Sequence, residues 1–383
     1  MRLIILTEAY FPRLNSASVQ MNDLVSGITS LDIKCSVLYW SSSSNELEDS
    51  KNTKHLKLKI NTWHKHSNII RFFAELFYSV ASYFKFYGDS NKYNGIIVYS
   101  PTIFLSITAF FLKIKYRCKV YLILRDIFPQ WLIDLGLIHE NSLIEKLLRM
   151  FETFQFKVAD KIGIQSIGNS SFITQKVSQG KVEIFENWIN IKSNTNQNLI
   201  NINLTKRYIY SGNIGVAQSI FDILDLARSV KYLDYEFIII GAGSEYKKLK
   251  AIIDTDGIYN LKILPNVSHE NLVKIYHTCS AGIILLDHRH TTHNIPGKFI
   301  SYISNGLPVF AVVNEKNDLI ETINNNGIGL AISDREKIVE NFEKFANNIA
   351  VTKDIGIKCI EFAKSRYCSI DRAKYLHTYF RGS

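Results

Sequence analysis

The stretch that decides the fold is His293-Asn-Ile-Pro-Gly-Lys-Phe-Ile-Ser-Tyr-Ile-Ser-Asn-Gly-Leu-Pro-Val309, which follows the apolar run Ala281–Leu286. It predicts a loop at the carboxyl end of a buried strand, a helix that begins at Pro296 and closes at Gly306, and another strand. The start of such a helix offers free N–H groups and a positive dipole to an anion. Lys298 lies in its first turn, where a cation does not favour the helix itself. The alternative is an ordinary surface lysine, but a strand-to-helix loop is where open α/β sheets bind ligands, so we expect Lys298 to bind an anion.

Strand-like and helical patterns alternate along the whole chain of 383 residues. The strand-like runs are Leu3–Leu6, Cys35–Tyr39, Ile96–Tyr99, Val120–Leu124, Ile162–Ile164, Val182–Phe185, Arg207–Tyr210, Glu236–Ile240, Leu261–Leu264, Gly282–Leu286, Pro308–Val313 and Ile328–Ile332. Continuous apolar strands separated by helices are typical of parallel sheets covered on both faces. The predicted fold class is therefore α/β, with two parallel-sheet domains in tandem.

An asparagine-rich polar stretch, residues 190–198, gives the best domain boundary. We expect a first domain at residues 1–190, a linker at 191–205 and a second domain at 206–354. The helical pattern of residues 355–383 has no strand after it, and we expect these helices to cross back to the first domain.

The net charge of +10 is unevenly distributed. Residues 51–125 carry 13 Lys and Arg against two acids, a balance of +11, with aromatic residues interleaved in 63–73 and 83–87. Such a face suits an anionic membrane surface or a phosphate-bearing partner. Nucleic acid is a rival partner, but no nucleic-acid-binding motif supports it, and a solvated basic helix with core aromatics is the plainest alternative. The apolar stretch 95–112 is broken at Ser100-Pro101, which favours a strand and a core helix over a membrane span.

The five cysteines are scattered, which argues for a reducing compartment and against a structural zinc site. The apolar run at the N-terminus is too short for a signal peptide and reads as a first strand. We therefore expect a cytoplasmic protein that lies peripherally at the inner face of the plasma membrane.

Two glycine-bearing turns follow strands in the second half of the chain. Gly212, Asn213 and Gly215 stand in the first turn, and Gly241 and Gly243 in the second. Small residues there let the backbone approach a diphosphate, although tight packing of strand against helix explains such glycines equally well. Neither turn has the spacing of a dinucleotide-binding fingerprint.

The second half resembles the retaining nucleotide-sugar glycosyltransferases of family 4. The resemblance rests on Tyr210-Ser-Gly-Asn-Ile-Gly215, Ile238-Ile-Ile-Gly-Ala-Gly243, Leu264-Pro-Asn-Val267, His293-Asn-Ile-Pro-Gly-Lys-Phe299 and Asn305-Gly-Leu-Pro308. In the first half, Leu124-Arg-Asp-Ile-Phe-Pro-Gln-Trp131, Asp160-Lys-Ile-Gly-Ile-Gln-Ser166 and Asn187-Trp188 are similar to the branch that builds O-antigens and capsules. The resemblance implies the GT-B fold, two facing Rossmann-like domains with a cleft between them.

The same resemblance implies transfer of a hexosyl or N-acetylhexosaminyl group, with retention, from a nucleotide diphosphate donor. A UDP-sugar is favoured over a GDP-sugar, and the acceptor is a polyprenyl-diphosphate-linked glycan. We expect Arg125, Asp126 and Lys298 to be the catalytic residues. The expected donor-binding residues are Ser16, Gly212, Asn213, Gly215, Gly241, Gly243, Asn266, Val267, Arg289, His293, Asn294, Ile295, Pro296, Gly297 and Ser301. We expect no metal and no cofactor.

The chain departs from the family pattern at several positions. His293 and Ser301 stand where the family carries a pair of glutamates, and a serine hydroxyl lacks the charge that strengthens a hydrogen bond to a ribose. Val216-Ala-Gln218 replaces an Arg/Lys pair, so Lys298 and Arg289 are the nearby cations left for two phosphates. Asn15-Ser-Ala-Ser18 replaces a glycine pair.

Two other classes of protein stay open at this point. One is a GT-B nucleotide-sugar 2-epimerase, which would act on its donor alone. The other is a non-catalytic, membrane-associated subunit of a polysaccharide assembly complex, which would keep the basic 51–125 segment but have no affinity for a nucleotide-sugar. Three histidines, His288, His290 and His293, lie close together, but their spacing in a loop favours contacts to phosphate or hydroxyl over a metal.

Overall fold

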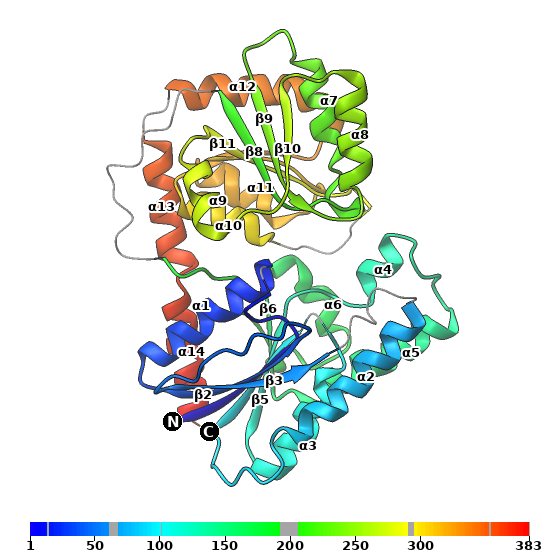
Figure 1. Cartoon of the computed structure of the whole chain (residues 1–383), viewed down its shortest axis with the longest axis vertical. Coiled ribbons are helices and arrows are strands. Elements are labelled where there is room, and N and C mark those ends of the chain that lie inside the picture. The colour runs from blue at the N-terminus through cyan, green and yellow to red at the C-terminus, as the bar shows by residue number, and fades with distance from the viewer. Residues whose placement is uncertain are drawn as a thin grey trace. The chain divides into compact units, whose positions relative to one another are not determined.

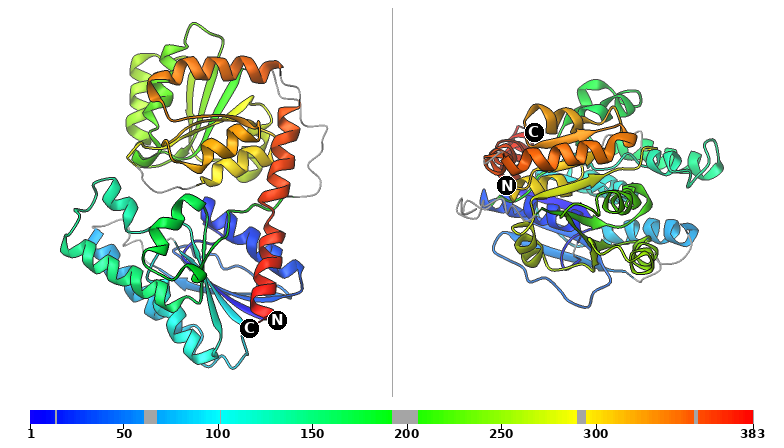
Figure 2. Two further views of the ribbon diagram at one scale, coloured as in Figure 1. Left: turned by 180° about the vertical axis from the view of Figure 1, so that it is seen from behind. Right: turned by 90° about the horizontal axis from the view of Figure 1, so that it is seen from above.

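The computed structural model describes residues 1–13, 15–60, 68–100, 102–191, 206–289, 295–351 and 354–382. The chain divides into two compact units: Met1–Asn190 with Cys368–Ser383, and Ile191–Tyr367. Each unit is a twisted sheet with helices on both of its faces (Figure 1). Both termini lie on the first unit (Figure 2).

The first unit contains a parallel sheet of seven strands in the order β3-β2-β1-β4-β5-β6-β7. Their bounds are β1 Arg2–Thr7, β2 Lys34–Ser41, β3 Thr53–Lys59, β4 Gly95–Ser100, β5 Lys119–Leu124, β6 Lys161–Ile164 and β7 Val182–Ile184. The strand order reverses between β1 and β4, and at this switch point the carboxyl ends of the strands form the place where open α/β sheets bind ligands. The sequence missed β3, because alternating lysines on an edge strand do not give an apolar run.

Helices cover the two faces of this sheet as separate layers. They are α1 Ser16–Ser30, α2 Asn68–Phe84, α3 Leu105–Tyr116, α4 Gln130–Asp134, α5 Leu143–Val158, α6 Ser170–Thr174 and α14 Ser369–Arg381. Successive strand residues point to opposite faces, so Leu3 and Ile5 pack with α1 and α14, while Ile4 and Leu6 pack with α3 and α5. Helix α2 contacts α3 on this second face.

The second unit contains a parallel sheet of six strands in the order β10-β9-β8-β11-β12-β13, with its switch point between β8 and β11. The strands are β8 Arg207–Asn213, β9 Glu236–Ala242, β10 Leu261–Leu264, β11 Ala281–Leu285, β12 Val309–Val312 and β13 Gly329–Ile332. The helices are α7 Phe221–Ser229, α8 Tyr246–Asp256, α9 His269–Tyr276, α10 Gly297–Ser304, α11 Asp318–Asn325, α12 Ile338–Val351 and α13 Ile355–Arg366. The loops after β8 and β11 therefore meet where a ligand is expected.

The C-terminal helices divide between the units, whereas the sequence assigned residues 355–383 to one block that returns to the first domain. Helix α13 belongs to the second unit, where it packs against α10 and where Phe299 contacts the ring of the buried Tyr367. Only α14 packs in the first unit, against α1, with Phe380 in the core of the sheet. The chain leaves and re-enters the first unit at one place, because Ile189 and Cys368 form a β-bridge.

The apolar stretch at residues 95–112 forms β4 and the start of α3, as predicted. None of the helices in the described parts of the chain combines the length and the apolar character needed to span a bilayer.

Candidate functional site

The loop after β8 and the first turn of α10 meet at the switch point of the second sheet. Gly212 has φ +135°, a left-handed conformation that favours glycine, and a Cβ placed there would lie 3.4 Å from Lys298 Cε. The hydroxyl of Tyr210 donates to the carbonyl of Asn213 at 2.6 Å, which fixes the ring under this loop. The residues that the sequence selected on two separate motifs thus lie in contact.

Lys298 is an unusual lysine in this setting. Its Nζ lies 3.6 Å from the centroid of the Tyr210 ring and is buried, and no described residue offers it a hydrogen bond. Burial alone lowers the pKa of Lys298 from 10.5 to about 7. The side chain as a whole is only half-buried, so its stem borders the surface while its amino group lies inside. A cation–π contact compensates a buried ammonium only in part, and the site is therefore prepared for an anion.

Gly241 and Gly243 hold the loop after β9 tightly against the loop after β8. A Cβ at Gly241 would lie 1.9 Å from the carbonyl oxygen of Gly212, and one at Gly243 would lie 2.1 Å from that of Ile214. The backbone of Ile214 also donates to the carbonyl of Ala242 at 2.9 Å. These two glycines allow one loop backbone to pack closely on the other, a contact that differs from the strand-on-helix packing considered from the sequence.

Asn213 and Gly215 shape the end of the first glycine turn. Asn213 Nδ2 donates to Gln218 Oε1 at 3.0 Å, and a Cβ at Gly215 would lie 2.8 Å from the same Nδ2. Asn266 is exposed and Val267 half-buried in the loop after β10, which is the outer strand at this edge of the sheet.

The entry to α10 differs by one residue from the prediction. Pro296 is the N-cap, with extended backbone, and the helix begins at Gly297, while Ile295 is buried before it. Ser301, in place of a family glutamate, donates to the carbonyl of Gly297 at 3.2 Å. His293 and Asn294 lie outside the described residues.

Arg289 already has an acidic partner. Its guanidinium donates to both carboxylate oxygens of Asp287, at 2.9 and 2.8 Å, in a bidentate pair. The hydrogen bonds from Arg289 lower the pKa of Asp287 to about 2. Arg289 would have to exchange this partner to meet a phosphate, whereas Lys298 would not.

In the first unit, Arg125 and Ser16 lie beside the switch point between β1 and β4. Arg125 follows β5, and its guanidinium donates to Ser16 Oγ and to the Tyr99 hydroxyl, both at 3.0 Å. Asp126 lies 4.0 Å from Arg125 Nε. The structure thus brings together the three residues that the sequence selected in this unit.

A buried chain of hydrogen bonds that the sequence did not predict supports Arg125. The Tyr99 hydroxyl donates to Gln20 Oε1 at 3.0 Å, and Gln20 Nε2 donates to Asn187 Oδ1 at 2.5 Å. The indole of Trp188 donates to the carbonyl of Gln20 at 2.6 Å. Burial raises the pKa of Tyr99, so its hydroxyl stays neutral and can both accept and donate. Asn187-Trp188 was the only signal of this network in the sequence.

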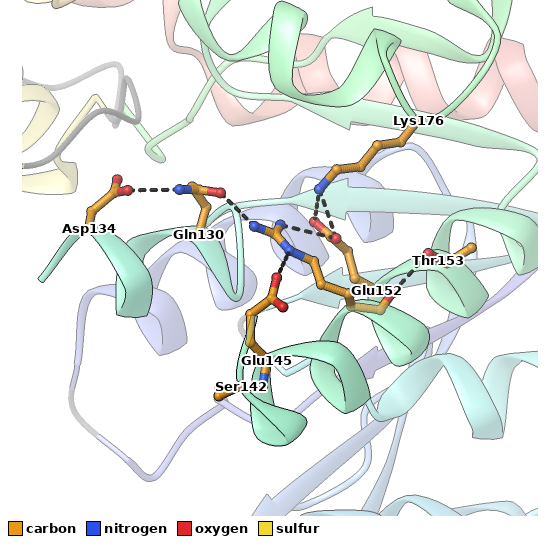
Figure 3. A network of polar contacts seen from close by, with 8 residues as sticks. Gln130, Asp134, Ser142, Glu145, Glu152, Thr153 and Lys176 are labelled. Atoms are coloured by element: carbon orange, nitrogen blue, oxygen red, sulfur yellow. Dashed lines mark hydrogen bonds and ion pairs between the residues drawn. The ribbon is translucent and has the colours of Figure 1, made fainter. Parts of the chain in front are cut away.

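A second polar network, shown in Figure 3, fixes the segment after Arg125 and Asp126. Arg149 on α5 donates to Glu145 at 2.8 Å and to Gln130, the first residue of α4, at 2.7 Å. The buried Glu152 accepts from Lys176 at 2.8 Å and from Arg149 at 3.3 Å. Glu145 and Glu152 are paired with Arg149 and Lys176, and Gln130 also donates to Asp134 at 2.8 Å, so these contacts tie α4 and the segment after α6 to α5. Across the described parts of the chain, no group of three or more His, Cys, Asp or Glu side chains could hold a metal ion.

Comparisons with known proteins agree with the motifs. The family model "Glycosyl transferases group 1" matches residues 194–358. A probable glycosyltransferase, WbjE of Pseudomonas aeruginosa, is 24% identical over 251 residues, and the match spans only 63% of this chain and 63% of that protein.

Two solved structures share the fold over nearly all of both chains. One is WaaG, a glycosyltransferase involved in lipopolysaccharide biosynthesis (11% identity, TM-score 0.68, 100% of each chain). The other is Alr3699/HepE of Anabaena in complex with UDP-glucose (12% identity, TM-score 0.69, 100% of each chain). The chain therefore has the GT-B fold, and its residues 194–358 match the model of the group 1 glycosyl transferases.

Proposed function

We propose that this protein is a retaining, metal-independent glycosyltransferase that moves a hexosyl or N-acetylhexosaminyl group from a UDP-sugar to a polyprenyl-diphosphate-linked glycan in bacterial O-antigen or capsule synthesis. The observation that carries the proposal is the buried amino group of Lys298 at the switch point of the second sheet, to which no described residue offers an acceptor. The match of residues 194–358 to the group 1 glycosyl transferase model supports it as well.

The chemistry of sugar transfer explains why such a lysine is useful. When the bond between the sugar and the diphosphate breaks, negative charge develops on the departing phosphate. A cation held in a buried site stabilises that charge more strongly than a hydrated cation would. An α-helix leaves the N–H groups of its first turn without intrahelical acceptors. In α10 the N–H of Phe299 already donates to the carbonyl of Pro296 at 2.9 Å, so those of Gly297 and Lys298 are the ones proposed to donate to the same phosphates.

The nucleotide is assigned from a weaker argument. The structural neighbour from Anabaena is described in complex with UDP-glucose, which supports a UDP-sugar over a GDP-sugar as the donor here. The donor itself is the only small molecule that the proposal requires, with no cofactor.

The acceptor side is assigned to Arg125, Asp126 and Ser16 in the first unit. Arg125 donates hydrogen bonds to Tyr99 and Ser16, and these two contacts fix the orientation of its guanidinium. In the retaining reaction, the departing phosphate accepts the proton of the acceptor hydroxyl on the same face of the sugar. The role left for Asp126 is to orient the sugar hydroxyls, because a carboxylate is a strong hydrogen-bond acceptor.

The lipid-linked acceptor places the protein at the anionic inner face of the plasma membrane. The balance of +11 over residues 51–125 supports this location. The aromatic residues expected to assist were Trp63, Phe72, Phe73, Phe84 and Phe86. Phe73 and Phe84 are exposed, whereas Phe86 is fully buried and cannot contact a bilayer. Phe72 is only partly exposed, because it packs on the rings of Phe104 and Phe151. Trp63 lies outside the described residues.

The direct test is donor binding by the purified chain. Thermal shift against UDP-, GDP- and dTDP-sugars should give the largest rise with a UDP-sugar, because a ligand that binds only the folded state raises its stability. Lys298→Ala should remove most of that rise, and Lys316→Ala, an exposed lysine of the same unit, should not. A Lys298→Ala protein that keeps the full shift would contradict the proposed site.

A further inference from the structure

Three neighbouring helices of the first unit carry large apolar side chains on their outer sides. We call this surface the α2–α3–α5 face. It consists of Ile70, Phe73, Phe77, Val80, Phe84, Phe110, Phe111, Ile114, Leu143, Ile144, Leu147 and Met150, all exposed. Figure 1 shows the three helices running together along one side of the unit.

The exposed residues of α2 form a single stripe. Ile70, Phe73, Phe77, Val80 and Phe84 recur at intervals of three and four residues, which places them on one side of the helix. The side chains of Phe73, Phe77 and Phe84 are 62–66% exposed. An ordinary surface helix is polar on this side, whereas α2 is apolar on a side that no described residue covers.

Ring contacts join the three helices into one continuous surface. Tyr83 on α2 lies 5.5 Å from the ring of Phe111 on α3, and Phe110 on α3 lies 5.6 Å from that of Phe154 on α5. Near the start of α2, Phe72 lies 6.0 Å from Phe151 on α5. Contiguous exposed apolar surface of this kind marks an interaction site in a soluble domain.

The charges around this face favour an anionic bilayer over an apolar protein surface. Cations on the three helices and the turns that follow them are exposed: Lys85, Lys92, Lys115, Arg117, Lys146 and Lys157. Between residues 70 and 158, Glu140 is the one acid whose described side chain is exposed. Apolar side chains with a rim of lysine and arginine are the pattern of helices that lie in the bilayer interface.

We propose that the α2–α3–α5 face inserts its apolar side chains into the interface of an anionic lipid bilayer, with the lysine and arginine rim on the headgroups. This inference rests on the membrane location within the proposed function and specifies the surface and the mode of binding. Insertion adds a contribution that salt does not screen, whereas the contacts of the rim are screened within a Debye length of about 10 Å at 0.1 M salt. Binding should therefore be only partly released by salt.

Sedimentation of the full chain with vesicles tests the proposal. One series uses phosphatidylcholine alone and the other adds phosphatidylglycerol, each at low and high salt. The Phe73→Ser, Phe77→Ser, Phe84→Ser variant should bind both kinds of vesicle at least tenfold more weakly than the wild type. A matched control changes three exposed residues of the second unit to serine, Tyr232, Tyr259 and Ile357, and should bind as the wild type does. The Lys85→Glu, Lys146→Glu, Lys157→Glu variant should bind the vesicles with phosphatidylglycerol more weakly than the wild type does. Its affinity for phosphatidylcholine vesicles should not change.

A second measurement does not depend on how well the serine variant folds. Phe77→Trp should give a fluorescence signal that brominated acyl chains quench, whereas Tyr259→Trp should not. Wild-type binding together with quenching of Phe77→Trp supports the proposal. Wild-type binding that the serine variant keeps in full, without quenching, overturns it and leaves the membrane location standing.

Two further outcomes overturn the proposal in other ways. If the wild type binds no vesicle, both the face and the membrane location fail, while donor binding by the second unit stays a separate result. If light scattering shows a dimer that the serine variant dissociates, and no vesicle is bound, the face is a contact between two copies of the chain.

Discussion

The carboxyl edges of the two sheets carry one key cation each, and the two cations are held in opposite ways. In the first unit, Arg125 donates to Tyr99 and Ser16, and a buried chain through Gln20 holds Tyr99. In the second unit, Lys298 is buried over Tyr210 and no described residue gives it an acceptor. Hydrogen-bond partners within the protein fix the position of Arg125. The amino group of Lys298 has no acceptor among the described residues, so we infer that a ligand supplies one. This difference is the reason why we propose that the second unit stabilises the developing phosphate charge and that the first unit orients the acceptor.

The largest effect on activity should come from replacing Lys298. Lys298→Ala should lower kcat/KM for the transfer by roughly 30- to 1000-fold, which corresponds to about 2–4 kcal/mol of lost stabilisation of the developing charge. Steady-state kinetics with the donor found by thermal shift measures it, with Lys316→Ala as the control. A decrease in kcat/KM below threefold would show that Lys298 does not stabilise the developing phosphate charge.

The glycines behind Lys298 should matter for folding rather than for contact with the ligand. Gly241→Ala places a Cβ against the carbonyl of Gly212, so the two loops must separate, at a cost of about 1–3 kcal/mol in the free energy of unfolding. Urea denaturation measures the loss. Gly180→Ala is the control, because a Cβ there meets no atom within 4 Å. Equal stability of the two variants would contradict the packing explanation.

Asp126 should separate turnover from donor binding. Asp126→Asn keeps the shape of the side chain but weakens its charged hydrogen bonds, so turnover should fall roughly tenfold, equivalent to about 1.4 kcal/mol. Donor affinity by calorimetry should stay unchanged, because the nucleotide is assigned to the second unit. An equal loss of donor binding would move Asp126 out of the assigned acceptor site.

The smallest effect should come from the support of Arg125. Tyr99→Phe removes the hydrogen bond that the Arg125 guanidinium donates to the Tyr99 hydroxyl, so kcat should fall about three- to tenfold with donor affinity unchanged. Ser16→Ala removes the hydrogen bond from Arg125 to Ser16, and it should lower kcat by a similar factor. If both single variants and the double variant retain wild-type kcat, Arg125 needs no positioning by Tyr99 and Ser16. The proposed difference between Arg125 and Lys298 would then fail for Arg125.

Sequence alone predicted the fold and the strand-to-helix loops that meet at the switch point of the second sheet, because both depend on local patterns. Continuous apolar strands with helices between them specify parallel sheets, and Pro296 and Gly306 bracket α10 within one residue of its true start. The missed strand β3 lacks an apolar run, because it lies at the edge of its sheet. The block 355–383 was placed wholly with the first unit, since nothing local in α13 indicates that it packs on α10.

The features that depend on long-range contacts could not be read from the pattern. Gln20 lies 79 residues from Tyr99 and 167 from Asn187, so their hydrogen bonds exist only in the folded chain. The pairing of Arg289 with Asp287 required the conformation of the loop, although the two residues are neighbours in sequence. The burial of Phe86, in contrast to the exposure of Phe84, depends on which way the turn after α2 faces.

We propose that the amino group of Lys298 binds the diphosphate of the donor, and the pH dependence of UDP binding decides whether it does. The free site has a lysine pKa of about 7, because burial disfavours its charge, and a bound diphosphate favours the charged form and raises that pKa. Binding should therefore take up a proton above pH 7, and affinity should fall by up to about tenfold per pH unit between pH 7 and 9. Calorimetry from pH 6 to 9 should show this fall in the wild type, and weak binding without it in Lys298→Met. Wild-type affinity that is constant over this range, or a Lys298→Met protein that binds UDP as tightly as the wild type, would contradict the claim.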